Sequence, residues 1–250
     1  PSDARDVLIY VHGFNNTFPE GVLRLAQLSH DLDLDAVTVH FAWPSAANPL
    51  AYERDRGSAL FSRDALEEVI GIANRSGARR VIVIAHSMGA FLTMETLRQM
   101  AIARPGSVAR DVHGVVMISP DIDIAVFRTQ ARRIGKLPGI FAIFVSEQDR
   151  ALRLSARLTG EPVRLGTLAD SEEIADLKVT LINVSQFADR QGLGHFVPGT
   201  SPELIEILSR AAEVDNAFDR DAAGRTGLLP GSVLTIQNVT QFVLIPVSPN

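Results

Sequence analysis

Six short runs of mostly apolar residues, rich in Val and Ile, recur along the 250-residue chain. Their nearly continuous apolar character is typical of strands that are covered on both faces of a sheet. Several of the runs are separated by segments whose apolar residues recur at helical spacing. Parallel strands need crossover connections of this kind. The pattern therefore predicts an α/β fold with a doubly wound, mostly parallel sheet. The expected strands are residues 7–11, 37–41, 81–85, 115–119, 140–145 and 179–184.

Apolar residues at helical spacing predict the helices that join these strands. The first helix is expected after the start signal Asn16-Thr17, with an apolar stripe between residues 22 and 32. Residues 52–75 are interpreted as one long amphipathic helix that ends near Gly77. Further helices are expected over residues 88–103, 124–134, 151–158 and 202–214.

The chain shows one long α/β region and a different tail. No internal repeat, low-complexity tract or flexible linker divides residues 1–216, so they are expected to form a single domain. Residues 217–250 form a C-terminal extension that should pack on the same domain. Two apolar runs in it, 233–236 and 242–247, indicate a pair of strands joined by Gln237-Asn238. This pair could form an appended hairpin or extend an edge of the sheet.

The charge balance disfavours nucleic acid as a partner. The chain has 24 Lys and Arg against 29 Asp and Glu, a net charge of -5, without basic clusters. Nucleic-acid binders and polybasic membrane anchors both depend on a positive surface. No apolar run approaches the roughly 18 to 20 residues that cross a bilayer, so no integral membrane segment is expected. The beginning of the chain also lacks the features of a signal peptide, but a targeting segment can be removed, so the localisation stays undetermined.

Several kinds of chemistry are disfavoured by what the sequence lacks. It contains no cysteine, which excludes a thiolate nucleophile, a disulfide framework and cysteine-ligated metals. It has neither an HExxH pair nor a phosphate-binding GxxxxGK[ST] loop. No metal and no organic cofactor are therefore expected.

The most informative segment is VIVIAHSMGAF, residues 81–91, in which a strand runs through a serine directly into a helix. A serine at so sharp a turn needs small residues two positions before and two after it. Ala85 and Gly89 stand there, so the motif is AxSxG rather than GxSxG. The pattern predicts that Ser87 is a nucleophile. The oxyanion that forms when Ser87 attacks a carbonyl would then lie at the start of the following helix. The alternative is that Ser87 only caps this helix.

A second motif follows the first strand, where the chain reads YVHGFNN. A glycine after an early strand lets a backbone N–H turn toward a substrate carbonyl. The N–H groups of Phe14 and Met88 are therefore expected to form the oxyanion hole, with Asn15 as the second choice for Phe14. The alternative is an ordinary turn in which Asn15 and Asn16 are only turn formers.

The segments VHGFNNT, FAWPS, AHSMG, SEQDRAL and GHF together resemble the α/β-hydrolase superfamily. More narrowly, the chain resembles a largely uncharacterised branch of esterase-like bacterial serine hydrolases with little or no cap. The resemblance covers roughly residues 7–214. It implies an α/β-hydrolase fold with nucleophile, acid and histidine in that order along the chain.

This order implies a triad for Ser87. Only His195, in a glycine-flanked loop after the last main strand, can then be the base. Asp149 is the expected acid because it follows the strand that usually carries this residue in the superfamily. Asp121 and Asp123, which follow the preceding strand, are the alternatives. Glu147 is a more distant choice.

The expected activity is hydrolysis of carboxylic esters through an acyl-enzyme intermediate, on a small-molecule or lipid-like substrate. The connections between the later strands are too short for a large cap, so the cleft should be shallow. Trp43, Leu193 and Phe196 are expected to line it together with Phe14, although Trp43 could instead be a packing residue. The alternatives are an acyltransferase, thioesterase or peptidase with the same triad, or a noncatalytic binding protein with this fold. The oligomeric state cannot be read from the sequence.

Overall fold

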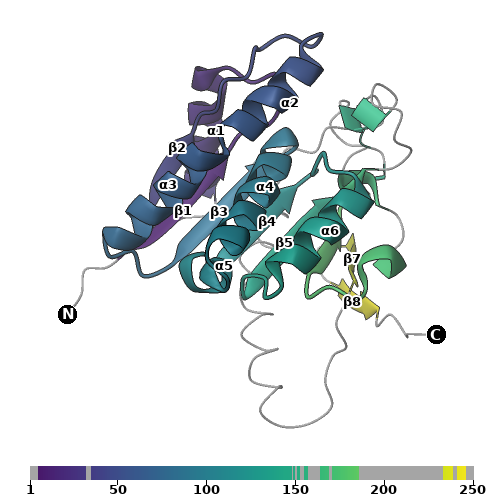
Figure 1. Cartoon of the computed structure of the whole chain (residues 1–250). Coiled ribbons are helices and arrows are strands. Elements are labelled where there is room, and N and C mark those ends of the chain that lie inside the picture. The colour runs from purple at the N-terminus through teal and green to yellow at the C-terminus, as the bar shows by residue number, and fades with distance from the viewer. Residues whose placement is uncertain are drawn as a thin grey trace.

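The fold is built on one sheet with strand order β2-β1-β3-β4-β5-β6-β7-β8 (Figure 1). A computed structural model describes residues 5–31, 35–147, 149, 151–152, 155–156, 164–168, 171–185, 233–238 and 241–245. Every neighbouring pair of strands is parallel except the last, β7 and β8. The strands are β1 Asp6–Val11, β2 Ala36–Phe41, β3 Val81–His86, β4 Gly114–Ile118, β5 Ile140–Val145, β6 Thr180–Asn183, β7 Val233–Asn238 and β8 Gln241–Ile245. The predicted fold class, a doubly wound and mostly parallel sheet, is confirmed.

The C-terminal strands extend the edge of this sheet. The β7 strand pairs in parallel with β6, and β8 pairs antiparallel with β7. The register of the β7–β8 pair shifts between Ile236 and Asn238. Of the two arrangements expected for the tail, the structure has the one in which the pair continues the main sheet.

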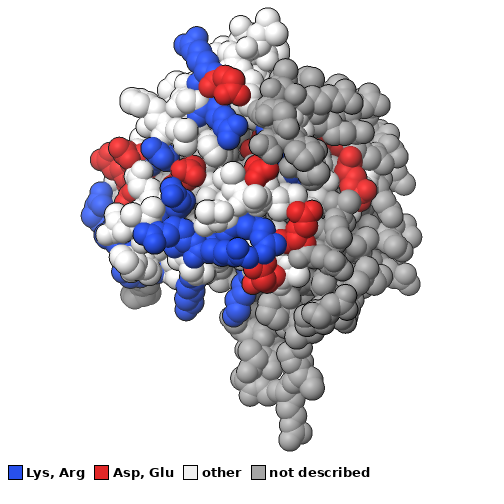
Figure 2. All heavy atoms as spheres, turned by 45° about the vertical axis from the view of Figure 1, so that its right-hand side comes forward, with Lys and Arg blue, Asp and Glu red and all other residues white. Residues whose placement is uncertain are grey.

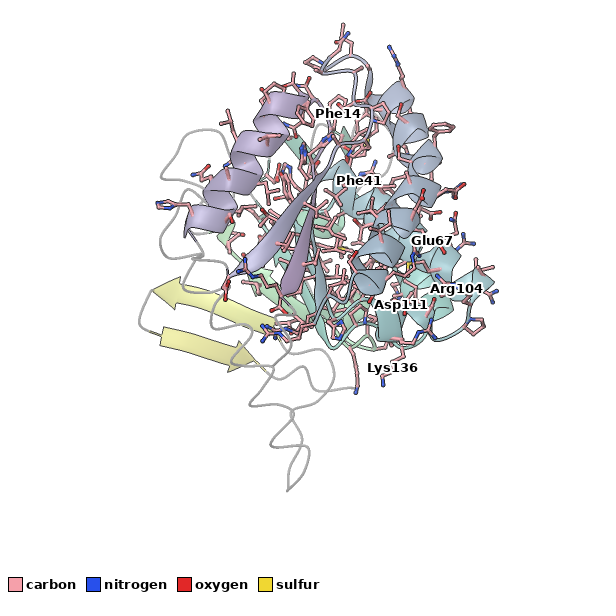
Figure 3. All side chains as sticks on the ribbon, turned by 90° about the vertical axis from the view of Figure 1, so that its left-hand side faces the viewer. Phe14, Phe41, Glu67, Arg104, Asp111 and Lys136 are labelled. Atoms are coloured by element: carbon pink, nitrogen blue, oxygen red, sulfur yellow. The ribbon has the colours of Figure 1, made fainter. Side chains whose placement is uncertain are left out.

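Helices cover both faces of the sheet, as Figures 1 and 3 show. The α1 helix lies on one face, over Leu8, Tyr10 and Ile84, and the larger core lies between the other face and the remaining helices. The central α4 contacts α2, α3, α5 and α6 on that second face. The helices are α1 Phe18–Asp31, α2 Tyr52–Phe61, α3 Arg63–Arg75, α4 Met88–Ala103, α5 Ser107–Asp111 and α6 Ile124–Ile134, with 3-10 turns at Leu165–Thr167 and Ser171–Ile174.

The prediction of one helix over residues 52–75 was wrong, because the structure divides this stretch at Ser62. The Ser62 hydroxyl donates to the Ser58 carbonyl (2.8 Å), and its backbone N–H is shared between the carbonyls of Ser58 and Ala59. A serine hydroxyl that competes for a helical carbonyl bends or interrupts a helix. Helices α2 and α3 are therefore two segments. The short α5 helix was not predicted, and the stretch expected to be helical at 202–214 lies outside the described residues.

The start of α1 is fixed by a reciprocal cap. The Glu20 carboxylate accepts hydrogen bonds from the backbone N–H and the hydroxyl of Thr17, both at 2.7 Å. Glu20 N–H lies 3.4 Å from the Thr17 hydroxyl in return. This is the capping box that places a helix start at a defined residue, and it confirms the start signal at Asn16-Thr17. The same cap fixes the residue at which the turn after β1 ends and α1 begins.

Charges of both signs lie on the surface. Figure 2 shows a band of Lys and Arg atoms on one face, with Asp and Glu atoms beside it. Among the ion pairs, Arg128 and Arg132 both reach Asp176, at 3.2 and 3.0 Å. Exposed pairs of this kind contribute little to stability. None of the helices that the structure describes is long and apolar enough to cross a membrane.

Candidate active site

Ser87 lies between β3 and α4 in a backbone conformation that is rare for a residue with a side chain. Its φ is 52° and its ψ is -121°. The conformation is held by backbone hydrogen bonds, because Ser87 N–H donates to the Ile118 carbonyl (3.0 Å) and its own carbonyl accepts from Asp121 N–H (3.2 Å). Ser87 occupies the N-cap position of α4, yet its side chain makes no capping hydrogen bond. The geometry is that of a strained strand-to-helix elbow.

Two glycines allow the chain to pack tightly around this elbow. A side chain at Gly89 would come within 2.4 Å of the His12 carbonyl oxygen. A side chain at Gly13 would come within 2.7 Å of His86 Nδ1 and 3.0 Å of Ser87 Cβ. The contact at Gly89 is with backbone that cannot give way, so this position requires glycine, and a side chain at Gly13 would displace the His86 ring. The turn after β1 is therefore packed directly against Ser87.

His12 orients the peptide that was predicted to supply an oxyanion donor. Its buried ring has Nδ1 2.9 Å from the Gly13 carbonyl oxygen and Nε2 3.1 Å from the Trp43 carbonyl oxygen. Burial lowers the pKa of His12, so the ring is neutral near pH 7 and donates to one of these carbonyls at a time. In a trans peptide the C=O and the N–H point in opposite directions. With the Gly13 carbonyl facing the His12 ring, the N–H of Phe14 faces away from it.

Trp43 completes this arrangement. Its indole N–H donates to the His12 carbonyl at 2.8 Å, and its ring stacks on the His12 ring with centroids 5.0 Å apart and planes 7° apart. Trp43 is buried, which agrees with the packing alternative considered for it. Its place in a substrate pocket stays a prediction.

A fully buried carboxylate holds the segment that follows Trp43. Asp55, in α2, accepts a hydrogen bond from the Ser45 hydroxyl (2.6 Å) and another from Ala46 N–H (2.8 Å). Ala47 then takes a positive φ of 48°. The segment after β2 is thereby tied to α2, which packs against α4.

The carboxylates considered for the acid have different surroundings in the structure. Asp149 follows β5, is fully buried, and accepts a hydrogen bond from Leu152 N–H at 3.0 Å. Asp123 caps α6, because its Oδ1 accepts from Val126 N–H at 2.9 Å. Asp121 uses both oxygens in a buried cluster with Tyr52, Ser155 and Arg164. Glu147 is exposed.

Other predicted site residues are placed as follows. Met88 is the first residue of α4 and is buried. Phe14 lies at the end of the sheet away from Arg104 and Asp111 (Figure 3). Its ring meets the Tyr52 ring edge to face, with the ring centroids 5.4 Å apart. His195, Leu193 and Phe196 lie outside the described residues.

A cavity of about 390 Å³ lies beside the elbow on the α1 face. Phe14, His86 and Ile118 line it where it approaches the elbow, and Glu20 and Arg24 line it along α1. Of the predicted pocket walls that the structure describes, Phe14 belongs to this cavity. Within the described ranges, no group of three His, Asp or Glu side chains could hold a metal ion.

Three polar residues of this region carried no signal in the sequence. Tyr52 reads as the first residue of a helix, and Ser155 and Arg164 stand in stretches without a motif. Their common partner, Asp121, is 69, 34 and 43 positions away from them along the chain, so no local pattern could have joined them.

The family match agrees with this architecture, and solved structures show distant likenesses. The family model described as alpha/beta hydrolase of unknown function (DUF900) matches residues 1–211. TT1662 from Thermus thermophilus shares 14% identity over 86% of this chain and 90% of its own, with a TM-score of 0.50. A hyperthermophilic esterase from Pyrobaculum calidifontis shares 16% identity over 87% and 78%, with a TM-score of 0.49. A dienelactone hydrolase from Anabaena variabilis shares 13% identity over 88% of each chain, with a TM-score of 0.48. At 14% identity the likeness to TT1662 concerns the fold alone. No curated protein matches the chain.

Proposed function

The chain belongs to the family of alpha/beta hydrolases of unknown function, and from this premise we propose that it is a serine hydrolase that cleaves carboxylic esters. The observation that carries the proposal is the elbow at Ser87. The positive φ of this serine and the glycines packed around it are costly features. Strain of this kind is retained where it serves a site, and here it presents a hydroxyl at the beginning of α4.

The proposed reaction begins with the Ser87 hydroxyl. His195 takes the proton as Ser87 Oγ attacks the ester carbonyl carbon, and the carbonyl oxygen becomes an oxyanion. The N–H groups of Phe14 and Met88 stabilise that charge. The bond to the leaving alkoxide then breaks, and the alkoxide takes the proton back from His195. An acyl-enzyme with Ser87 remains.

A water molecule completes the cycle. His195 removes a proton from the water, whose oxygen attacks the acyl carbon. The bond to Ser87 Oγ breaks, Ser87 recovers its proton from His195, and the carboxylic acid leaves. Asp149 is the proposed acid that orients His195 and stabilises its charged form. The commitment of both Asp121 oxygens to Tyr52, Ser155 and Arg164 supports this choice over Asp121.

The test is covalent labelling with a fluorophosphonate, which traps an activated serine. Intact-mass measurement is expected to show one adduct on the wild type and none on Ser87→Ala. Ser107→Ala, which removes a buried hydroxyl in α5, is the control that should still be labelled. If the folded wild type gains no adduct, the serine-hydrolase proposal fails and a noncatalytic binding role takes its place. Screening of labelled enzyme against esters, thioesters and amides then identifies the preferred acyl donor.

A further inference from the structure

Four buried polar side chains from separate segments meet beside the elbow, and the acyl transfer proposed above does not use them. Tyr52 is the first residue of α2, Asp121 follows β4, and Ser155 and Arg164 belong to the chain after β5. The Tyr52 hydroxyl donates to Asp121 Oδ2 (2.8 Å), and the Ser155 hydroxyl donates to Asp121 Oδ1 (2.7 Å). Arg164 Nε lies 3.2 Å from the same Oδ1. We refer to these four residues as the Asp121 cluster.

The Asp121 cluster is enclosed in the protein. The side chains of Arg164 and Asp121 are 1% and 3% exposed. A buried ion pair is often no more stabilising than apolar residues of the same volume, because both charges lose their hydration. Stability alone therefore gives little reason for an Arg and an Asp here. A fixed geometry of hydrogen-bonding groups is what such a pair supplies in addition.

The backbone around the cluster is equally constrained. Leu165 N–H donates to the Ile122 carbonyl (2.8 Å), and Gly166 N–H donates to the Pro120 carbonyl (3.0 Å). A side chain at Gly166 would come within 2.7 Å of the Ser119 carbonyl carbon. The segment that carries Arg164 is thus packed onto the loop that carries Asp121, and the ion pair has little freedom to move.

Two contacts connect the cluster to the groups that would react. Asp121 N–H donates to the Ser87 carbonyl at 3.2 Å. The Tyr52 ring meets the Phe14 ring edge to face, with centroids 5.4 Å apart and planes 69° apart. The cluster therefore touches the backbone of the proposed nucleophile through one member and the residue of a proposed oxyanion donor through another.

We propose that Tyr52 is a positioning residue: Asp121, itself paired with Arg164, fixes the Tyr52 hydroxyl, and the Tyr52 ring holds Phe14 so that the Phe14 N–H is aligned with the oxyanion. The inference rests on the proposed function of Ser87. Burial raises the pKa of Tyr52 to about 12, so the hydroxyl keeps its proton at neutral pH and can donate to Asp121. Tyr52 itself touches no reacting atom in this account.

The position of an oxyanion donor matters in the transition state more than in the bound ester. Loss of a whole donor costs about 100- to 1,000-fold in kcat, and a displaced donor should cost less. Tyr52→Phe keeps the ring and removes the hydroxyl. We expect it to lower kcat about tenfold and to change KM by less than about twofold.

The experiment compares Tyr52→Phe with the wild type and with Ser107→Ala, which also loses one buried hydroxyl but lies in α5. Hydrolysis of p-nitrophenyl butyrate is measured per active site, counted by fluorophosphonate labelling. The inhibition constant of a trifluoromethyl ketone, which forms an oxyanion on the serine, is measured beside that of the corresponding uncharged alcohol. Tyr52→Phe should weaken the binding of the ketone by about the factor by which it lowers kcat, and it should leave the binding of the alcohol unchanged. Ser107→Ala should change neither.

Two results would overturn the inference. One is a Tyr52→Phe enzyme that is less stable but has wild-type kcat and ketone affinity per active site, which would make the cluster purely structural. The other is a raised KM with unchanged kcat, which would place Tyr52 in ground-state binding. Ser155→Ala, which removes a hydroxyl 2.7 Å from Asp121 Oδ1 and 3.0 Å from the Tyr52 hydroxyl, should act in the same direction as Tyr52→Phe and decides the matter if the latter does not fold. Absence of labelling on the wild type would instead refute the proposed function, and this inference with it.

Discussion

Ser87 and Ser119, which follow β3 and β4, both have positive φ angles, 52° and 46°. A non-glycine residue in such a conformation costs on the order of 1–3 kcal/mol and persists only where its surroundings enforce it. Here the backbone does so, because Ser87 N–H donates to the Ile118 carbonyl and Ser119 N–H donates to the Phe144 carbonyl, both at 3.0 Å. Strain at two adjacent strand ends is consistent with the site proposed at this edge of the sheet.

At the same scale, Asp149 can be tested as the acid by Asp149→Asn. The amide oxygen can still accept from Leu152 N–H, so the fold should be retained. The amide cannot stabilise a charged His195, and we expect kcat to fall by about three to four orders of magnitude. The measurement is ester hydrolysis per folded enzyme, with Glu147→Gln as a control that keeps its activity. Full turnover in Asp149→Asn would transfer the acid role to Asp121 or Asp123.

At the scale of elements, the sequence predicted what depends on local apolar spacing. The expected segments at 88–103, 124–134 and 140–145 coincide with α4, α6 and β5, because each is buried along one face or on both. The break at Ser62 was missed, since a hydroxyl that competes for the Ser58 carbonyl leaves the apolar pattern unchanged. The contact between Tyr52 and Asp121 was missed because it depends on how distant elements pack.

The beginning of α6 gives a prediction that separates capping from catalysis. Asp123→Ala removes the acceptor for Val126 N–H and should lower the free energy of unfolding by about 1 kcal/mol, while kcat stays unchanged. Asp123→Asn, which retains a capping oxygen, should be close to the wild type in stability. Urea denaturation and ester hydrolysis of both variants provide the measurements. A large loss of kcat in Asp123→Asn would mean that this residue, not Asp149, carries the acid function.

For the whole molecule, parallel pairing explains why residues far apart in sequence can share one site. Strands β1 to β5 run in the same direction, so their carboxyl ends lie at one edge. Phe14, Trp43, Ser87, Asp121 and Asp149 each follow one of these five ends. In open α/β sheets, ligands bind at this edge. The parallel direction of the strands could be expected from the fold class, but their order and the side-chain contacts at the edge required the structure.

A carboxylate at the opposite end of the sheet makes the stability of the molecule depend on pH. Asp6, at the start of β1, forms hydrogen bonds with Arg79 and Arg80, which precede β3. These bonds, that of Arg79 first, hold the pKa of Asp6 well below its usual range, although burial opposes the shift. A carboxyl with a lowered pKa stabilises the folded state above its unfolded pKa, near 3.9, and this contribution is lost as the pH falls below that value.

We therefore expect Asp6→Asn to unfold at a lower urea concentration than the wild type at pH 7, since the variant has no carboxylate to pair with Arg79 and Arg80. As the pH falls below about 4, the wild type should lose stability more steeply than the variant, and the two should converge. Urea titrations over this range measure the difference. Asp176→Asn is the matched control: the pKa of Asp176 is also lowered, chiefly by Arg132, but this carboxylate is exposed, so solvent screening should make its effect smaller. Parallel pH profiles for the wild type and Asp6→Asn would show that the link between β1 and β3 does not depend on the charge of Asp6.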